Sequence, residues 1–70
     1  MKVKRPMNNL KLLRKSKGLS QKALAEKVGI RWNVISTYER GVRIPDVFTL
    51  YSISVALGCT MDYLIQDFQN

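Results

Sequence analysis

The stretch SQKALAEKVGIRWNVISTYERG, Ser20 to Gly41, contains two short helical patterns separated by a single glycine, Gly29. The first pattern places its apolar residues on one face, as a helix packed on a core does. The second pattern has only Ile35 and Tyr38 as clear inward-facing anchors. It therefore predicts a helix that contributes little to the core and leaves its other faces free.

Glycines and small polar residues mark the ends of five such patterns along the chain. Asn8, Ser20, Asp46 and Thr60 stand where helices need an N-cap, and glycines follow the first four patterns. We therefore predict an all-α, compact five-helix domain with short connections. Its helices are expected within residues 8–18, 20–29, 31–41, 45–58 and 60–70.

The last two patterns carry the longest apolar stripes. In the fourth helix the side chains expected to face the core are Val47, Leu50, Ile53, Ala56 and Leu57. In the fifth they are Met61, Leu64, Ile65 and Phe68.

Composition excludes several functions. The 70 residues contain one cysteine and no histidine, which leaves neither a disulfide framework nor the usual ligands of a zinc site. The sequence lacks paired carboxylates, a nucleophile with a base, and a phosphate-binding loop. We therefore expect a protein that is not an enzyme and binds no cofactor or metal. The single cysteine fits a reducing, cytoplasmic location, and no apolar run reaches membrane-spanning length.

The charge is unevenly distributed. Residues 1–45 carry all twelve Lys and Arg and two Glu, a net charge of +10, whereas residues 46–70 carry three Asp and no cation. A basic half on a small domain suits a polyanion such as nucleic acid, although a solvated basic surface would have the same composition.

The junction of the second and third helices is typical of a helix-turn-helix. Ala25 is small where two helices approach closely, and Gly29 stands where the turn requires a positive φ. The third helix, residues 31–39, is then exposed and could enter the major groove of DNA.

The ordered set of short motifs resembles the phage repressor/Cro-type (Xre-like) helix-turn-helix family. The resemblance extends from Leu10 to about Ile65, roughly four-fifths of the chain. Its residues are Leu10, Leu13, Arg14, Gly18 to Gln21, Leu24, Ala25, Gly29, Ile30, Ile35, Ser36, Glu39 to Gly41, Pro45 and Ala56 to Gly58.

This resemblance implies roles for the exposed residues. The base-contact candidates are Arg31, Trp32, Asn33, Ser36 and Thr37, and the phosphate-contact candidates are Gln21, Lys22, Arg40 and Arg43. The alternative for each is a solvated side chain without a DNA contact, and for Trp32 a place in a protein interface.

Two further features concern the third helix. The family has Ser or Thr where this chain has Arg31, so the N-terminal cap of that helix is expected to be lost. Arg14 and Glu39 match a pair that forms an internal ion pair in some members, and we expect that pair here.

The resemblance implies a sequence-specific transcriptional regulator, expected to be a repressor, that binds a pseudo-palindromic operator as a homodimer. The dimer-interface candidates are Tyr51, Met61, Tyr63, Ile65 and Phe68. Residues 1–8 are expected to form a basic, flexible arm, residues 9–66 the DNA-binding domain, and residues 67–70 a tail. The alternative is a protein-interaction module, antitoxin-like or a co-regulator, with weak or non-specific DNA binding.

Overall fold

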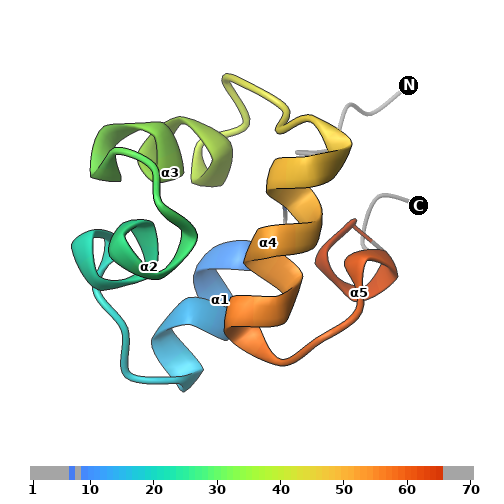
Figure 1. The fold of residues 1–70 in the computed structure, drawn as a ribbon, viewed down its shortest axis with the longest axis horizontal. Helices are drawn as coiled ribbons and strands as arrows, with labels where there is room; N and C mark the ends of the chain where they lie inside the picture. Colours follow the sequence, from blue (N-terminus) through green and yellow to red (C-terminus); the bar gives the residue numbers. More distant parts are fainter. Residues whose placement is uncertain (1–6, 8, 66–70) are drawn as a thin grey trace.

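Five short helices, joined by short connections, form the described part of the chain (Figure 1). The computed structural model describes residue 7 and residues 9–65, and within them the fold is all-α, as predicted. The helices are α1 (Leu10–Ser16), α2 (Gln21–Val28), α3 (Trp32–Glu39), α4 (Val47–Leu57) and α5 (Met61–Ile65). Among these helices, none has the length and apolar character needed to cross a lipid bilayer.

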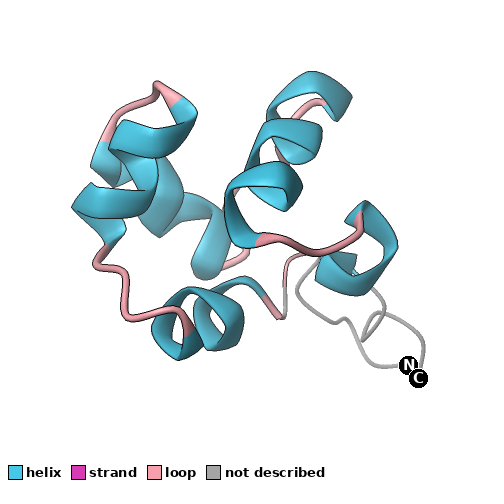
Figure 2. Ribbon diagram, turned by 60° about the horizontal axis from the view of Figure 1, so that its bottom comes forward, coloured by secondary structure: helices cyan, strands magenta, loops and turns pink. Residues whose placement is uncertain are grey.

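The longest helix, α4, connects the two sides of the molecule. It packs against α2 on one side and α5 on the other, while α3 lies against α1 and α2 (Figures 1 and 2). Side chains from every helix meet in one buried cluster: Met7, Leu10, Leu24, Ala25, Ile35, Tyr38, Ile53, Leu57 and Leu64.

Met7, one residue of the predicted N-terminal arm, is part of the core. Its side chain is only 1% exposed, and its carbonyl oxygen accepts a hydrogen bond of 3.1 Å from the Leu10 amide. That bond turns the chain into α1 and holds the side chain against the core. The other residues of the arm, and residues 66–70, lie outside the described part of the chain.

Three of the predicted N-caps are present. The side-chain oxygens of Ser20, Asp46 and Thr60 accept hydrogen bonds of 2.9, 2.7 and 3.1 Å from amides three residues later. These bonds satisfy N–H groups that the first turn of a helix leaves without an intrahelical partner.

The start of α1 differs from the prediction. Asn8 lies outside the described residues, and Asn9 occupies the cap position without a side-chain cap bond. Asn9 already has helical dihedrals, whereas capping residues are normally extended. Its side-chain amide instead donates to the Tyr63 carbonyl at 2.7 Å, which ties α1 to α5.

The predicted stripe of α4 is partly wrong. Ile53 and Leu57 are buried and Leu50 packs at the edge of the core, but Val47 is 59% exposed. Val47 lies in the first turn of α4, one turn before its first core contact. Since much of the remaining surface of this helix is also apolar, α4 has a second hydrophobic side that the core does not use.

Candidate nucleic-acid interface

The turn between α2 and α3 is fixed by backbone geometry. Gly29 has φ of +85°, a conformation open to glycine at little cost. The amides of Gly29 and Ile30 both donate to the Ala25 carbonyl, at 2.7 and 3.0 Å. Because Ala25 is small and buried, α3 crosses close to α2, and these two helices form the predicted helix-turn-helix.

Helix α3 divides into a buried face and an open face. Ile35 and Tyr38 are buried in the core, whereas Asn33 is exposed and Trp32 is 50% exposed. The helical spacing therefore places the predicted base-contact residues on a side of α3 that the domain leaves open. These residues are Arg31, Trp32, Asn33, Ser36 and Thr37.

Two of these residues already make hydrogen bonds within the domain. The Thr37 hydroxyl donates to the Val34 carbonyl at 2.6 Å, so its methyl group and lone pairs are what it can offer a ligand. Ser36 is half-buried, and its hydroxyl oxygen accepts from Arg40 Nε at 3.3 Å. The Asn33 side chain, like those of Arg31 and Trp32, makes no hydrogen bond to another described residue, so both the donor and the acceptor of its amide are open to a ligand.

The N-terminus of α3 lacks a side-chain cap, as predicted. Arg31 has the extended dihedrals of a capping residue, but its side chain makes no cap bond. An arginine has no acceptor to offer the first amides, and its charge opposes the positive end of the helix dipole.

The C-terminus of α3 is held by a buried polar network. Arg14 Nε donates to Glu39 Oε2 at 2.6 Å, and Arg14 Nη2 donates to Glu39 Oε1 at 3.2 Å. The expected ion pair is thus present and two-pronged. A further bond from Arg14 Nη1 to the Leu19 carbonyl, at 2.7 Å, ties the α1–α2 connection to the same group.

Gln21 joins this network instead of standing free. Its Nε2 donates to Glu39 Oε1 at 3.0 Å, which connects the first residue of α2 to the last residue of α3. A primary amide has two N–H groups, so one donor is left for a phosphate oxygen. The sequence predicted the phosphate role; it did not predict Glu39 as the internal acceptor.

A cleft of about 340 Å³ opens beside this network. It brings together residues from α1, the start of α2 and the start of α3: Arg14, Ser20, Gln21, Lys22 and Trp32. The phosphate candidates Gln21 and Lys22 therefore lie next to the base-contact candidate Trp32. The positive end of the α2 dipole adds to the attraction of this cleft for an anion.

The loop after α3 carries the other two phosphate candidates. Thr37 holds the loop, because its carbonyl accepts from the amides of Val42 and Arg43 at 2.9 and 3.4 Å. Arg40 and Arg43 are both exposed, and Pro45 is buried before α4 begins. The basic residues therefore lie close along the chain to α3 and on a loop anchored to that helix.

Comparison with known proteins gives the same assignment. Residues 10–64 match the family model described as Helix-turn-helix. The chain belongs to the helix-turn-helix family of DNA-binding transcriptional regulators. One relative, the uncharacterized HTH-type transcriptional regulator YqaE of Bacillus subtilis, is 44% identical over 62 residues, covering 89% of this chain and 53% of YqaE. The chain thus spans about half the length of that relative.

Solved structures of this family superpose closely on the chain. The P22 c2 repressor in complex with a synthetic operator has a TM-score of 0.82 at 33% identity, covering 90% of this chain and 97% of that one. The SinR protein/SinI protein complex contains a chain with a TM-score of 0.82 at 29% identity, covering 91% of this chain and 63% of that one.

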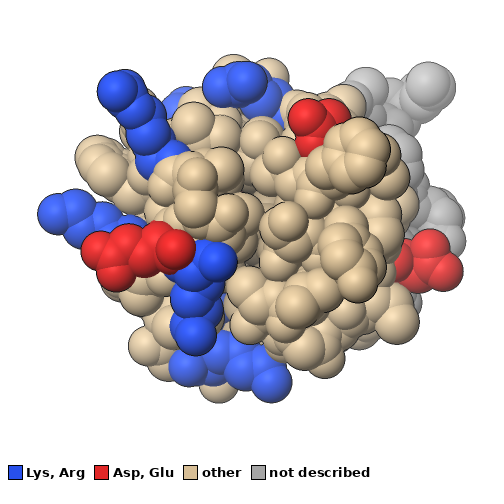
Figure 3. Space-filling view, in the orientation of Figure 1, with Lys and Arg blue, Asp and Glu red and all other residues tan. Residues whose placement is uncertain are grey.

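The charged side chains are unevenly distributed over the surface of this helix-turn-helix domain. Figure 3 shows Lys and Arg along the left, upper and lower parts of the view, while the broad area over α4 lacks them. Residues 46–65 contain Asp46 and Asp62 and no Lys or Arg.

The structure separates the dimer-interface candidates into two groups. Tyr51 and Tyr63 are exposed, whereas Met61 and Ile65 are half-buried, and Phe68 lies outside the described residues. Sequence reasoning missed the large exposed apolar side chains that accompany Tyr51 on the α4 side: Ile44, Val47, Phe48 and Val55. Their signal was present in the sequence, because apolar residues occur all round α4 and not on one stripe alone.

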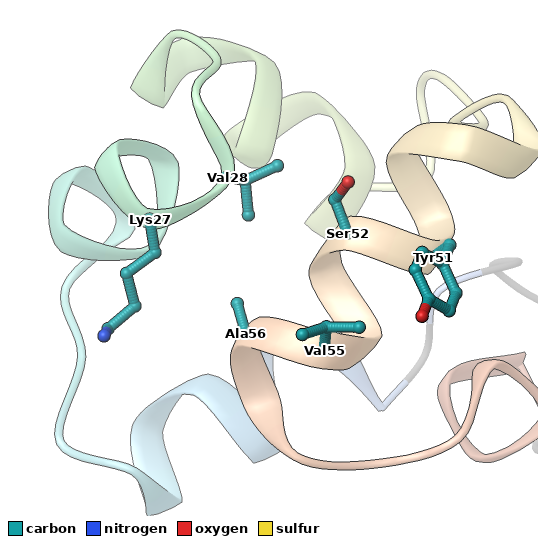
Figure 4. Close-up of a pocket in the computed structure, with 6 residues that line it drawn as sticks. All are labelled: Lys27, Val28, Tyr51, Ser52, Val55 and Ala56. Carbon is teal, nitrogen blue, oxygen red and sulfur yellow. The ribbon is translucent and has the colours of Figure 1, made fainter.

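Beside these side chains lies a shallow groove between α2 and α4 (Figure 4). Its volume is about 390 Å³, and its lining residues are Lys27, Val28, Tyr51, Ser52, Val55 and Ala56.

Proposed function

We propose that this chain is a sequence-specific DNA-binding transcriptional regulator, a repressor, that binds a pseudo-palindromic operator as a homodimer. The observation that carries the proposal is the division of α3. Its core-facing residues are Ile35, Tyr38 and Glu39, while its polar residues lie on an open side next to exposed cations. A helix of this width fits the major groove, where each base pair presents a distinct pattern of donors and acceptors.

In this proposal the open side of α3 reads the base edges. The free amide of Asn33 has the donor and acceptor needed to pair with adenine, and the Thr37 methyl suits the methyl group of thymine. Trp32 supplies apolar area at the start of the helix, beside the cleft that holds Lys22. Arg31 and Ser36 flank this row.

The same orientation directs cations to the sugar-phosphate backbone on both sides of the groove. At the start of α2, Lys22 and the second amide N–H of Gln21 bind phosphates of one DNA strand. Arg40 and Arg43, on the loop that Thr37 anchors, bind phosphates of the other strand. These contacts set position and affinity, and the base contacts set specificity.

The repressor and homodimer assignments rest on family likeness and on size. The P22 c2 repressor, solved in complex with a synthetic operator, matches nearly the whole of this chain. One recognition helix reads only half of a typical site, and two related by a dyad read half-sites about 34 Å apart. Because operator DNA is the proposed partner, we propose that the protein acts in the cytoplasm, where the genome lies.

The alternative function is a protein-interaction module, such as an antitoxin-like protein or a co-regulator, that binds DNA only weakly. The SinR protein/SinI protein complex and the half-exposed Trp32 favour it. Salt separates the two functions. Binding through phosphates releases counterions from DNA, and added salt reduces the entropy gained by that release, so affinity falls steeply. Binding through apolar contacts has no such dependence.

A titration of isotope-labelled protein with a mixed-sequence DNA duplex tests which surface binds. We expect the largest amide shift changes in residues 20–22 and 31–43, reversed at high salt. The outer side of α4 serves as the internal control and should not respond. Changes confined to α4, or none at low salt, would contradict the proposed function.

A further inference from the structure

Helix α4 carries a continuous apolar surface that the core does not use. Phe48 is 80% exposed, and Tyr51 and Val55 are each 60% exposed. Their spacing of three and then four residues places them on one side of the helix, which we call the α4 outer face. Single exposed apolar residues are ordinary, but a row of large ones on so small a domain indicates a binding surface.

DNA does not suit the α4 outer face. Residues 46–65 offer no Lys or Arg to neutralise phosphates, and the two charges present, Asp46 and Asp62, are negative. Figure 3 shows the same area over α4 without basic side chains. Because Phe48, Tyr51 and Val55 are exposed on this face, an apolar partner fits it better than DNA does.

The two ends of α4 are complementary to each other. Near its N-terminus, Phe48 projects as the most exposed of the large apolar side chains, close to the carboxylate of Asp46. Near its C-terminus lies the groove against α2, with Val55 on its wall and the cation Lys27 at its edge. One end thus presents a projecting ring beside an acid, and the other a hollow beside a base.

We propose that a second copy of this chain docks on the α4 outer face, with the two α4 helices antiparallel. With the dyad close to Tyr51, Phe48 of each copy lies over the groove beside Val55 of the other, and Asp46 approaches the end that carries Lys27. A two-fold interface requires this kind of self-complementary surface. The inference rests on the proposed homodimer and names the surface that forms it.

Charge-pair variants test the antiparallel register. An acidic variant, Phe48→Glu with Val55→Glu, and a basic variant, Phe48→Lys with Val55→Lys, change exposed positions only, and circular dichroism checks that both remain folded. By sedimentation we expect a wild-type dimer and a dissociation constant raised at least about tenfold in each variant alone. An equimolar mixture should dimerise again, because opposite charges then face each other. A monomeric wild type, variants that dimerise like it, or a mixture that stays monomeric would each overturn the proposal.

A disulfide tests the position of the dyad. In a Cys59→Ser background, Tyr51→Cys should form a covalent dimer on mild oxidation, because the two copies meet at that residue. Leu12→Cys, on exposed α1, is the matched control and should remain monomeric. Equal crosslinking of the two, or none at residue 51, would place the dyad elsewhere and overturn the proposal.

DNA binding, measured on the same proteins, separates this inference from the proposed function. If the protein dimerises through α4 but does not bind DNA, the proposed function is wrong and the α4 interface is supported. Operator binding by an acidic variant that still sediments as a dimer would contradict the α4 interface and remain consistent with the proposed function.

Discussion

Arg14, Glu39 and Gln21 form the connection on which the position of α3 depends. Their hydrogen bonds of 2.6 to 3.2 Å join α1, the start of α2 and the end of α3 within a nearly dry site. Removing two charges from water costs free energy that their attraction only partly returns. The network therefore contributes more to the orientation of α3 than to stability.

Removal of either charge should destabilise the fold more than removal of both. Arg14→Met or Glu39→Met alone leaves one buried charge facing an apolar side chain, and we expect a loss of about 3–5 kcal/mol. The double variant should recover at least half of that loss, because no buried charge then remains at the pair. Urea unfolding at low temperature measures all three variants, and additive losses in the double variant would contradict the argument.

Asn33 is the residue whose removal should alter sequence preference most cleanly. Asn33→Ala should reduce discrimination at one base pair of each half-site by about 1–3 kcal/mol while leaving thermal stability unchanged, since the side chain makes no bond within the described structure. Competition binding against operators with single base changes measures this effect.

Arg43→Ala is the matched control for Asn33→Ala. It should weaken binding to every sequence by a similar factor, because a phosphate contact carries no base information. An unchanged preference in Asn33→Ala would remove Asn33 from the base-reading row.

Residue-level features were predictable where their causes are local. Ser20, Asp46 and Thr60 cap their helices because each precedes a helix at the required spacing, and Gly29 turns left-handed because few other residues do. The acceptor for Gln21 and the burial of Met7 depend on parts of the chain far apart in sequence. Local patterns contain no information about these contacts.

Among the helices, α4 shows that an apolar stripe does not always predict which residues are buried. The stripe correctly identified Ile53 and Leu57 as core, but Val47 is outside it and Phe48, Tyr51 and Val55 form a second side. When a helix is apolar on all sides, its sequence alone does not show which side faces the core. Packing against α2 and α5 decides which side is buried.

The N-cap of α4 should make stability depend on acid pH. Hydrogen bonds from Thr49 lower the pKa of Asp46 in the folded state. Because this pKa is lower than in the unfolded chain, stabilisation is complete above the unfolded value and is lost as the pH falls through the folded value. Melting temperatures should therefore decline below about pH 4.

Asp46→Asn separates this carboxylate from the other acids. Asparagine keeps an acceptor for the Thr49 amide but does not titrate in this range. The decline in melting temperature between pH 5 and pH 3 should be shallower in the variant. Identical pH profiles for the two proteins would show that Asp46 does not contribute to the acid dependence.

The uncapped start of α3 offers a stabilising change. Arg31 has φ of −77° and ψ of 147°, close to the dihedrals of the capping residue Ser20. In Arg31→Ser the hydroxyl oxygen should therefore accept from the Val34 amide, and we expect about 1 kcal/mol of added stability. This corresponds to a rise of roughly 4–8 °C in melting temperature for a domain of this size.

Arg31→Ala is the matched control, because it removes the charge without adding an acceptor. A rise in melting temperature as large as that of Arg31→Ser would show that relief of charge, and not capping, is responsible. Weaker DNA binding by both variants would show that the natural arginine favours DNA contact over helix stability.

At the scale of the whole molecule, the surface of this small domain divides into a basic part and an apolar part, for which we propose different partners. The basic residues are distributed from α1 to the loop after α3, while α4 itself carries no Lys or Arg and presents an apolar surface (Figure 3). The five-helix fold was predictable, because caps and turns follow the sequence order, and the exposure of Arg31, Trp32 and Asn33 agrees with the predicted DNA side. The α4 outer face was not predictable, because its exposure depends on which neighbours the folded chain places around it.

Selection of random duplex DNA by the purified protein, at low and at near-physiological salt, tests most directly whether α3 reads a specific sequence. We expect enrichment of one inverted repeat whose half-sites are about one helical turn apart, retained at the higher salt. Recovery of DNA with no shared sequence, lost at the higher salt, would mean that only phosphates are bound, and α3 would then not be a recognition helix.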